Sequence, residues 1–298
     1  MSLVIVKPVV VTDEMLIDSN VPVDDYLPFE PDETYPVGAR VVVGRYIYES
    51  LADENQGNDP LDYPDKWLSP GVVNRWRAFD DKISTLTKRP GLITYRIKTG
   101  RAANSVGILN LKGATKVTVR SEDPQFGVHE RSAKVNAITP RPSWWHWYYG
   151  YKKARNQALF LRLPSYPKAE ICIEIEGGDS LGVGLIVLGQ QHRFGIGVEY
   201  GARAGFTSYS RVRRDPETGE VDIRRGRSSK RSVFNLAIYN YEFDQVSDFM
   251  QEIDSLPVLM IATDKYKAFT GYGLVKHFEP VMGNVATSDC SIEFDGFI

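Results

Sequence analysis

The sequence predicts a mainly β, multi-domain protein whose largest part is an antiparallel β-sandwich of jelly-roll type. Short runs rich in Val, Ile, Tyr, Thr and Phe recur, and they are bounded by Gly, Pro, Asn and Asp. Ile171, Ile173 and Ile175 alternate with Cys and Glu, which is the period of a strand with one buried face. The length of 298 residues suits about two domains of ordinary size.

Composition divides the chain into four segments. Residues 1–34 predict an extended acidic arm, and residues 35–80 predict a small aromatic β module. Residues 81–200 predict the β-sandwich, and residues 201–298 predict a β-rich domain that carries one helix.

The acidic arm is defined by its charge. Residues 8–39 contain eight acids and no Lys or Arg. These acids are Asp13, Glu14, Asp18, Asp24, Asp25, Glu30, Asp32 and Glu33. Such a segment cannot alone bury enough surface to offset its ordering entropy, and the apolar stretch 3–11 needs cover. We expect the stretch to add a strand to a partner chain or to the protein's own body.

The segment Ser210–Lys230 predicts a long β-hairpin that reaches away from its domain. Asp215–Glu220 supplies the turn, because Pro stands early in it and Gly stands late. The arginines of this hairpin suit contact with carboxylates of a neighbouring subunit. The candidate assembly-interface residues are Arg213, Arg214, Arg224, Arg225 and Arg227.

A helix is predicted over Asp244–Asp254, with Asp244 as its cap. Its apolar residues recur at spacings of three and four, and they are Val246, Phe249, Met250 and Ile253. A shorter helix near residues 70–79 has weaker periodicity.

Charge and hydropathy restrict the partners. The formal net charge of −2 and the pI of about 6.1 argue against nucleic-acid binding. No apolar run approaches the roughly 18 residues of a membrane span, and residues 1–11 lack the cleavage site of a signal peptide. We therefore expect no membrane insertion. An acidic head and a basic hairpin could pair between copies, although both could also be solvated surfaces.

No catalytic or metal-binding motif is present. His129, His146, His192 and His277 lack a second ligand at helical spacing, and two cysteines are too few for a Cys-rich metal site. No Gly-x-Ser-x-Gly elbow occurs. We therefore expect no enzyme, no catalytic residue, no metal and no cofactor. A glycan-cleaving enzyme with two distant carboxylates is the remaining enzymatic alternative.

The run Trp144–Tyr151 is the densest aromatic segment of the chain. Flat aromatic faces can stack on sugar rings, so the run could form a sugar-binding loop. It could equally form a buried aromatic belt or a contact between subunits, and these two alternatives are favoured.

Residues 35–67 carry a Tyr-x-x-Gly-x-x-Val strand from Tyr35 to Val41, a second strand with Tyr46 and Tyr48, an Asn/Pro loop and a closing Trp67. This order resembles the small carbohydrate-binding modules of chitinases. The resemblance implies weak glycan binding, with candidate residues Tyr46, Tyr48, Asn55, Asn58, Tyr63 and Trp67. The alternative is that the same aromatics form the module's own small core.

Residues 72–298 resemble tail proteins of double-stranded DNA bacteriophages. The resemblance lies in Asn74–Asp80, the aromatic run at Trp144, and the Gly-rich segments at Gly182 and Gly195–Gly201. It implies a structural component of a phage tail tip or baseplate, made in the host cytoplasm and assembled into the virion in several copies. Its partners would be copies of itself and other tail proteins. The alternative is a tail protein that binds a receptor or glycan on the host surface.

Overall fold

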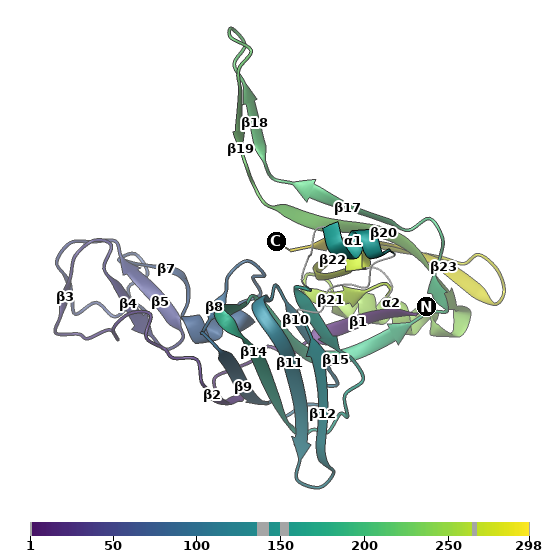
Figure 1. Cartoon of the computed structure of the whole chain (residues 1–298), viewed down its shortest axis with the longest axis horizontal. Coiled ribbons are helices and arrows are strands. Elements are labelled where there is room, and N and C mark those ends of the chain that lie inside the picture. The colour runs from purple at the N-terminus through teal and green to yellow at the C-terminus, as the bar shows by residue number, and fades with distance from the viewer. Residues whose placement is uncertain (1, 136–142, 150–154, 264–266, 298) are drawn as a thin grey trace.

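The structure is a computed structural model that describes residues 2–135, 143–149, 155–263 and 267–297. Two large antiparallel sheets dominate it, and the longer helix lies near the C-terminus (Figure 1). The prediction of a mainly β, multi-domain antiparallel protein with a C-terminal helix is therefore confirmed.

The larger sheet has ten strands within the described residues. In spatial order they are β13 (Gln157–Phe160), β10 (Ser105–Leu109), β15 (Leu185–Phe194), β1 (Leu3–Pro8), β21 (Val258–Ile261), β22 (Thr270–Val281), β23 (Thr287–Gly296), β20 (Ser228–Tyr239) and β16 (Gly197–Val198), with β17 (Arg203–Ser208) also paired to β20. This sheet contains strands from both sides of residue 200, the expected boundary between two domains.

The second sheet has six strands in the part of the chain that the structure describes. They are β12 (Gly127–Lys134), β11 (Lys112–Asp123), β14 (Glu170–Val183), β9 (Leu92–Lys98) and β2 (Leu16–Ser19), with β8 (Thr87–Lys88) beside β14. Smaller elements are β3 (Thr34–Tyr35) with β6 (Asn55–Gln56), β4 (Arg40–Val43) with β5 (Tyr46–Ser50) and β7 (Trp67–Val72), and β18 (Arg211–Arg214) with β19 (Val221–Arg224). The helical segments are η1 (Asn74–Phe79), α1 (Trp144–Tyr149), η2 (Asn240–Glu242), α2 (Phe243–Glu252) and η3 (Lys267–Phe269).

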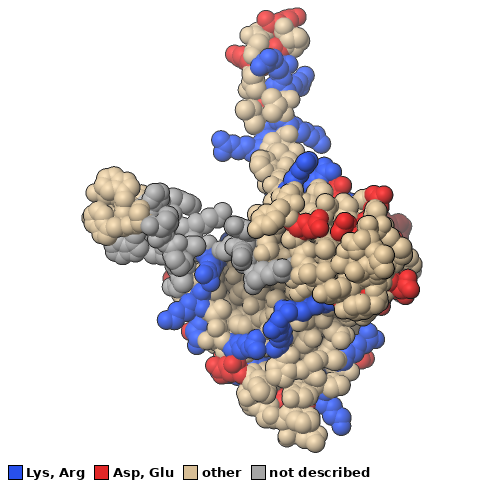
Figure 2. All heavy atoms as spheres, turned by 90° about the vertical axis from the view of Figure 1, so that its right-hand side faces the viewer, with Lys and Arg blue, Asp and Glu red and all other residues tan. Residues whose placement is uncertain are grey.

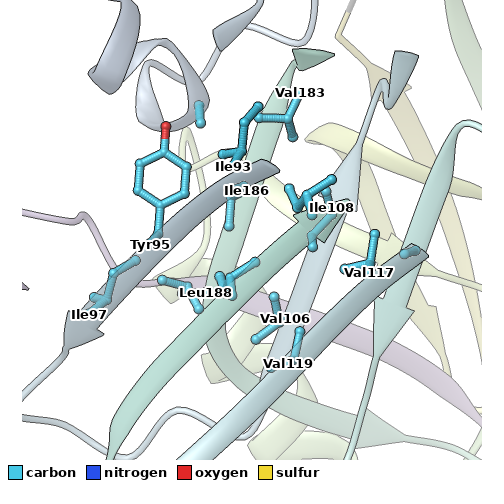
Figure 3. Close-up of a cluster of buried hydrophobic side chains, with 14 of the residues drawn as sticks. Ile93, Tyr95, Ile97, Val106, Ile108, Val117, Val119, Val183, Ile186 and Leu188 are labelled. Carbon is cyan, nitrogen blue, oxygen red and sulfur yellow. The ribbon is translucent and has the colours of Figure 1, made fainter. Parts of the chain in front are cut away.

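The six-stranded sheet and the β13–β10–β15 part of the larger sheet form a β-sandwich. Alternate residues of each strand enter the space between the layers, as Ile93, Tyr95 and Ile97 do from β9 (Figure 3). Val106 and Ile108 face them from β10. Burial of these side chains stabilises the sandwich through the hydrophobic effect.

Strand β1 lies inside the larger sheet, between β15 and β21. Leu3 and Ile5 pack into one apolar cluster together with α2, while Val4 and Val6 pack into a second cluster on the other face. Of the two possibilities expected for the apolar N-terminal stretch, the structure therefore has the second, a strand added to the protein's own body.

The rest of the acidic segment lies along the body. Strand β2 pairs with β9, and Pro28 forms a bridge with Val42. The Asp25 carboxylate accepts a 2.6 Å hydrogen bond from the Asn74 backbone N–H and pairs with Arg77 at 2.8 Å. Residues 2–34 are thus held by the body and by the module, and do not extend away as a free arm.

Helix α2 covers the face of the larger sheet that carries Leu3 and Ile5. Its buried residues are the ones the periodicity predicted, namely Val246, Phe249, Met250 and, just beyond its end, Ile253. The expected cap at Asp244 is wrong, because the helix begins at Phe243 and Asp244 lies within its first turn. The weak helical signal near residues 70–79 corresponds to the 3₁₀ segment η1.

We expect Ile5→Ala to lower the free energy of unfolding by about 2–5 kcal/mol, the usual cost of truncating a fully buried aliphatic side chain. Ile5 is 0% exposed, whereas Val10, just after the strand, is 74% exposed. Val10→Ala is the control and should change stability by less than about 0.5 kcal/mol. Urea denaturation measures both, and equal effects would contradict the central position of β1.

Candidate assembly interface and glycan-binding residues

A long β-hairpin arm projects from the end of the larger sheet (Figure 1). Its base is the antiparallel pair β17–β20, and its outer part is the pair β18–β19. The Asp215 N–H donates to the Glu220 carbonyl at 2.9 Å, and Gly219 has a φ of 73° in the left-handed region. The hairpin predicted over Ser210–Lys230 is therefore confirmed, and it starts earlier than expected, at β17.

The outer arm has two chemically different faces. Val212 lies opposite Ile223, and Arg214 opposite Val221, so one face is largely apolar. The other face carries the cross-strand pairs Arg211–Arg224 and Arg213–Asp222. All residues of β18 and β19 are exposed, including Val212 at 66% and Ile223 at 57%.

The basic side chains of the arm have few carboxylates of their own chain within reach. The one ion pair of the outer arm in the described structure joins Arg224 to Asp222, and its nitrogen–oxygen distance is 4.0 Å. Figure 2 shows blue side chains along the arm and red ones at its tip. Arg211 and Arg224 lie directly opposite each other, and like charges in that position destabilise a hairpin.

An isolated two-stranded ribbon in water is marginally stable at best. Here the ribbon leaves an apolar face in water and sets two arginines opposite each other, so it gains little from burial and is weakened by like-charge repulsion. A partner that covered Val212 and Ile223 and offered carboxylates to the arginines would satisfy both faces.

The predicted interface residues divide between the arm and its base. Arg213, Arg214 and Arg224 lie on the outer strands, and Arg225 follows directly after β19. Arg227 lines a cleft of about 370 Å³ at the base of the arm, together with Lys112 and Lys230. The Lys230 ammonium donates to the Thr270 carbonyl at 2.8 Å.

Trp67 belongs to the core of the N-terminal module. It is 3% exposed, and its ring lies 5.5 Å from Tyr35 and 5.9 Å from Phe29, both nearly edge-on. Its indole N–H donates to the Asn58 carbonyl at 2.9 Å. A ring buried in this way has no face available to stack on a sugar.

The amides of the Asn/Pro loop are engaged in holding the loop. The Asn58 amide donates to Asn55 Oδ1 at 2.8 Å, and Asn55, itself 2% exposed, donates to the Ser50 hydroxyl at 3.1 Å. Lys66 donates to Asn58 Oδ1 at 3.0 Å. These polar groups therefore satisfy each other, as buried amides must.

The three tyrosines of the candidate set differ in their surroundings. Tyr48 packs against the aromatic cluster around Trp67. Tyr46 and Tyr63 are 40% and 43% exposed. The Arg45 guanidinium lies over the Tyr46 ring at 5.4 Å, and Lys66 lies over Tyr63 at 5.6 Å. Of the candidate aromatic rings, only Tyr46 and Tyr63 are therefore largely open to solvent, and each is in contact with a basic side chain.

The adjacent carboxylates Asp80 and Asp81 have separate partners. Asp80 accepts the Thr85 hydroxyl at 2.8 Å, and burial raises its pKa. Asp81 accepts the Tyr272 hydroxyl, and burial raises the pKa of that phenol. Among the described residues, no group of three or more His, Cys, Asp and Glu side chains could hold a metal ion.

No family model matches the sequence, no curated protein is similar to it, and no solved structure matches its fold. Within the described residues, every helix is too short or too polar to cross a bilayer.

We expect Trp67→Ala to loosen the N-terminal module, since losing a buried Trp costs about 3–5 kcal/mol. Tyr63→Ala is the matched control, because Tyr63 lies in the loop just before Trp67 and is 43% exposed. Thermal unfolding and limited proteolysis between residues 34 and 72 measure the loss. An unchanged melting curve together with loss of binding on a glycan array would instead make Trp67 a binding platform.

Proposed function

We propose that the protein is a structural subunit of a multi-copy assembly and that its hairpin arm is the contact with a neighbouring subunit. The observation that carries the proposal is the arm itself, which has an exposed apolar face on one side and poorly paired arginines on the other. On the resemblance to phage tail proteins, we propose a tail tip or baseplate as the assembly and the virion as its location.

The arm is anchored in a way that suits a contact element. Strand β20 pairs with β23 along Arg231–Tyr239, and its Phe234, Leu236 and Ile238 are buried in the core. The same strand continues toward the arm, where it pairs with β17. A force or a binding event at the arm therefore acts directly on the larger sheet.

The acidic segment supplies a complementary surface for a second copy. Seven of its eight acids are exposed, namely Asp13, Glu14, Asp18, Asp24, Glu30, Asp32 and Glu33. The arm and the N-terminal module project from different sides of the molecule (Figure 1). A contact between the arm of one copy and the acidic segment of the next would be head-to-tail, and such contacts close into rings or continue as filaments.

A receptor- or glycan-binding role is the second candidate. It rests on the exposed rings of Tyr46 and Tyr63 in the module that resembles carbohydrate-binding domains. Removing both rings would abolish retention on a glycan, and the assembly of subunits would be unaffected.

We expect the triple variant Arg224→Glu, Arg225→Glu and Arg227→Glu to remain folded, because all three side chains are exposed. It should lose assembly, because glutamates would repel the carboxylates proposed to bind the arginines. Native mass spectrometry or analytical ultracentrifugation, with a tail protein extract where self-assembly needs it, measures the change. Adding salt should weaken the wild-type contact, since exposed charges are screened.

The control for this experiment is a reversal of three exposed bases on the body, Lys82→Glu, Lys88→Glu and Arg101→Glu. It changes the net charge equally and should leave assembly intact. Normal assembly of the arm variant would reject the role of the arm.

A further inference from the structure

Helix α1 presents four aromatic side chains to solvent. Trp144, Trp145, Tyr148 and Tyr149 are 69%, 61%, 60% and 62% exposed. The alternative that this run forms a buried aromatic belt is therefore wrong for these four residues. Gly150 and Tyr151, at the end of the run, lie outside the described residues. Large exposed apolar groups of this kind mark interaction sites.

The exposed rings pack on each other. Trp144 stacks on Tyr148 with ring centroids 5.7 Å apart and planes 19° apart, and Trp145 lies 4.3 Å from Tyr149. Tyr148 and Tyr149 are 4.8 Å apart. The side chains therefore form one compact aromatic tip and not a row of separate stacking faces.

The tip belongs to a loop with a closed neck. The Arg155 N–H donates to the Val135 carbonyl at 3.1 Å, and the Val135 N–H donates to the Thr115 carbonyl at 2.9 Å. These bonds fix both ends of the loop to the sandwich. Lys134 and Arg155 stand at this neck, and both are exposed.

The sequence around the tip is uniformly basic. Residues 131–169 contain eight Lys and Arg residues and no Asp or Glu. Five of these bases, Arg131, Lys134, Arg155, Arg162 and Lys168, lie among the described residues, and Lys134 and Arg155 flank the loop that carries the tip. The complementary partner is an extended anionic surface.

We propose that the tip of α1, with Lys134 and Arg155 at its neck, binds the surface of an anionic lipid bilayer. Trp and Tyr favour the membrane interface because each combines an apolar ring with a polar N–H or O–H. Nearby Lys and Arg are attracted to anionic headgroups. A helix of six residues is far too short to span, so the tip lies in the interface.

Single-stranded nucleic acid and glycans fit the tip less well. Both are bound by stacking on separate, free ring faces. In the tip, the Trp144 and Tyr148 rings each give one face to the other. The proposal does not depend on the role of the arm in assembly.

The test uses the full chain with vesicles of phosphatidylcholine alone or mixed with phosphatidylglycerol. We expect the protein to co-sediment with the mixed vesicles, more weakly at high salt, and to bind the neutral vesicles poorly. Trp67 and Trp76 are buried, so quenching of Trp fluorescence by brominated lipid reports on the exposed tip. No co-sedimentation with the mixed vesicles would overturn the proposal.

Two variants probe the two parts of the site. Trp144→Ala with Trp145→Ala should weaken binding to the mixed vesicles by at least about tenfold. Lys134→Glu with Arg155→Glu should remove the preference for the anionic lipid. The control, Tyr200→Ala with Tyr241→Ala, removes two rings that are 107% and 79% exposed and should bind like the wild type.

Circular dichroism of each variant checks that the fold is unchanged. Equal binding by the Trp144→Ala, Trp145→Ala variant and the wild type would reject the tip as the site. Retention on single-stranded DNA or a glycan array without vesicle binding would assign the tip to that other partner and reject the bilayer.

Discussion

The insertion of β1 between β15 and β21 is the constraint on which the arrangement of the other elements depends. Its hydrogen bonds join the strands that close the sandwich to the strands that carry α2 and the arm. Leu3 and Val4 enter different apolar clusters, so the strand is buried on both faces. Without it, two strand edges would have unpaired backbone groups and two cores would open to water.

Close approach at one position shows how tightly this strand is held. Gly189 on β15 lies opposite Pro8, and a Cβ atom at Gly189 would collide with the Lys7 carbonyl. Glycine is therefore required there because of backbone packing and not because of a turn. The Lys7 side chain meanwhile pairs with Glu252 at the end of α2, which ties the strand to the helix that covers it.

Local patterns in the sequence predicted the elements whose partners are close along the chain. Pro216 and Gly219 predicted the hairpin, because a tight turn brings its two strands together, and the spacing of Val246, Phe249 and Met250 predicted α2. The position of β1 could not be predicted, because its partners β15 and β21 lie far along the chain and any edge strand could have accepted Leu3–Pro8.

At the candidate sites, the residue type could be read from the sequence, but the packing around each residue could not. Trp67 has the residue type of a sugar platform, and only the packing of Phe29 and Tyr35 around it makes it a core residue. Asn55 and Asn58 could hydrogen-bond a hydroxyl, but the fold directs them at each other. Trp144 and Trp145, in contrast to Trp67, are exposed, although a buried belt was one of the alternatives favoured for their segment. One signal in the sequence does distinguish this segment, because residues 131–169 contain no Asp or Glu.

The central place of β1 also sets the order of events during synthesis. Synthesis reaches β1 well before its two partners, because β15 ends at Phe194 and β21 is complete only when Ile261 has been added. Until β15 and β21 have been made, Leu3–Val6 is an apolar strand without its native partners, of the kind that pairs with other chains. Eight acids from Asp13 to Glu33 follow this apolar strand, in the way that charged gatekeeper residues flank aggregation-prone segments of natural sequences. The acidic segment therefore matters before the fold is complete, because its like charges disfavour pairing of β1 between chains until the sheet closes.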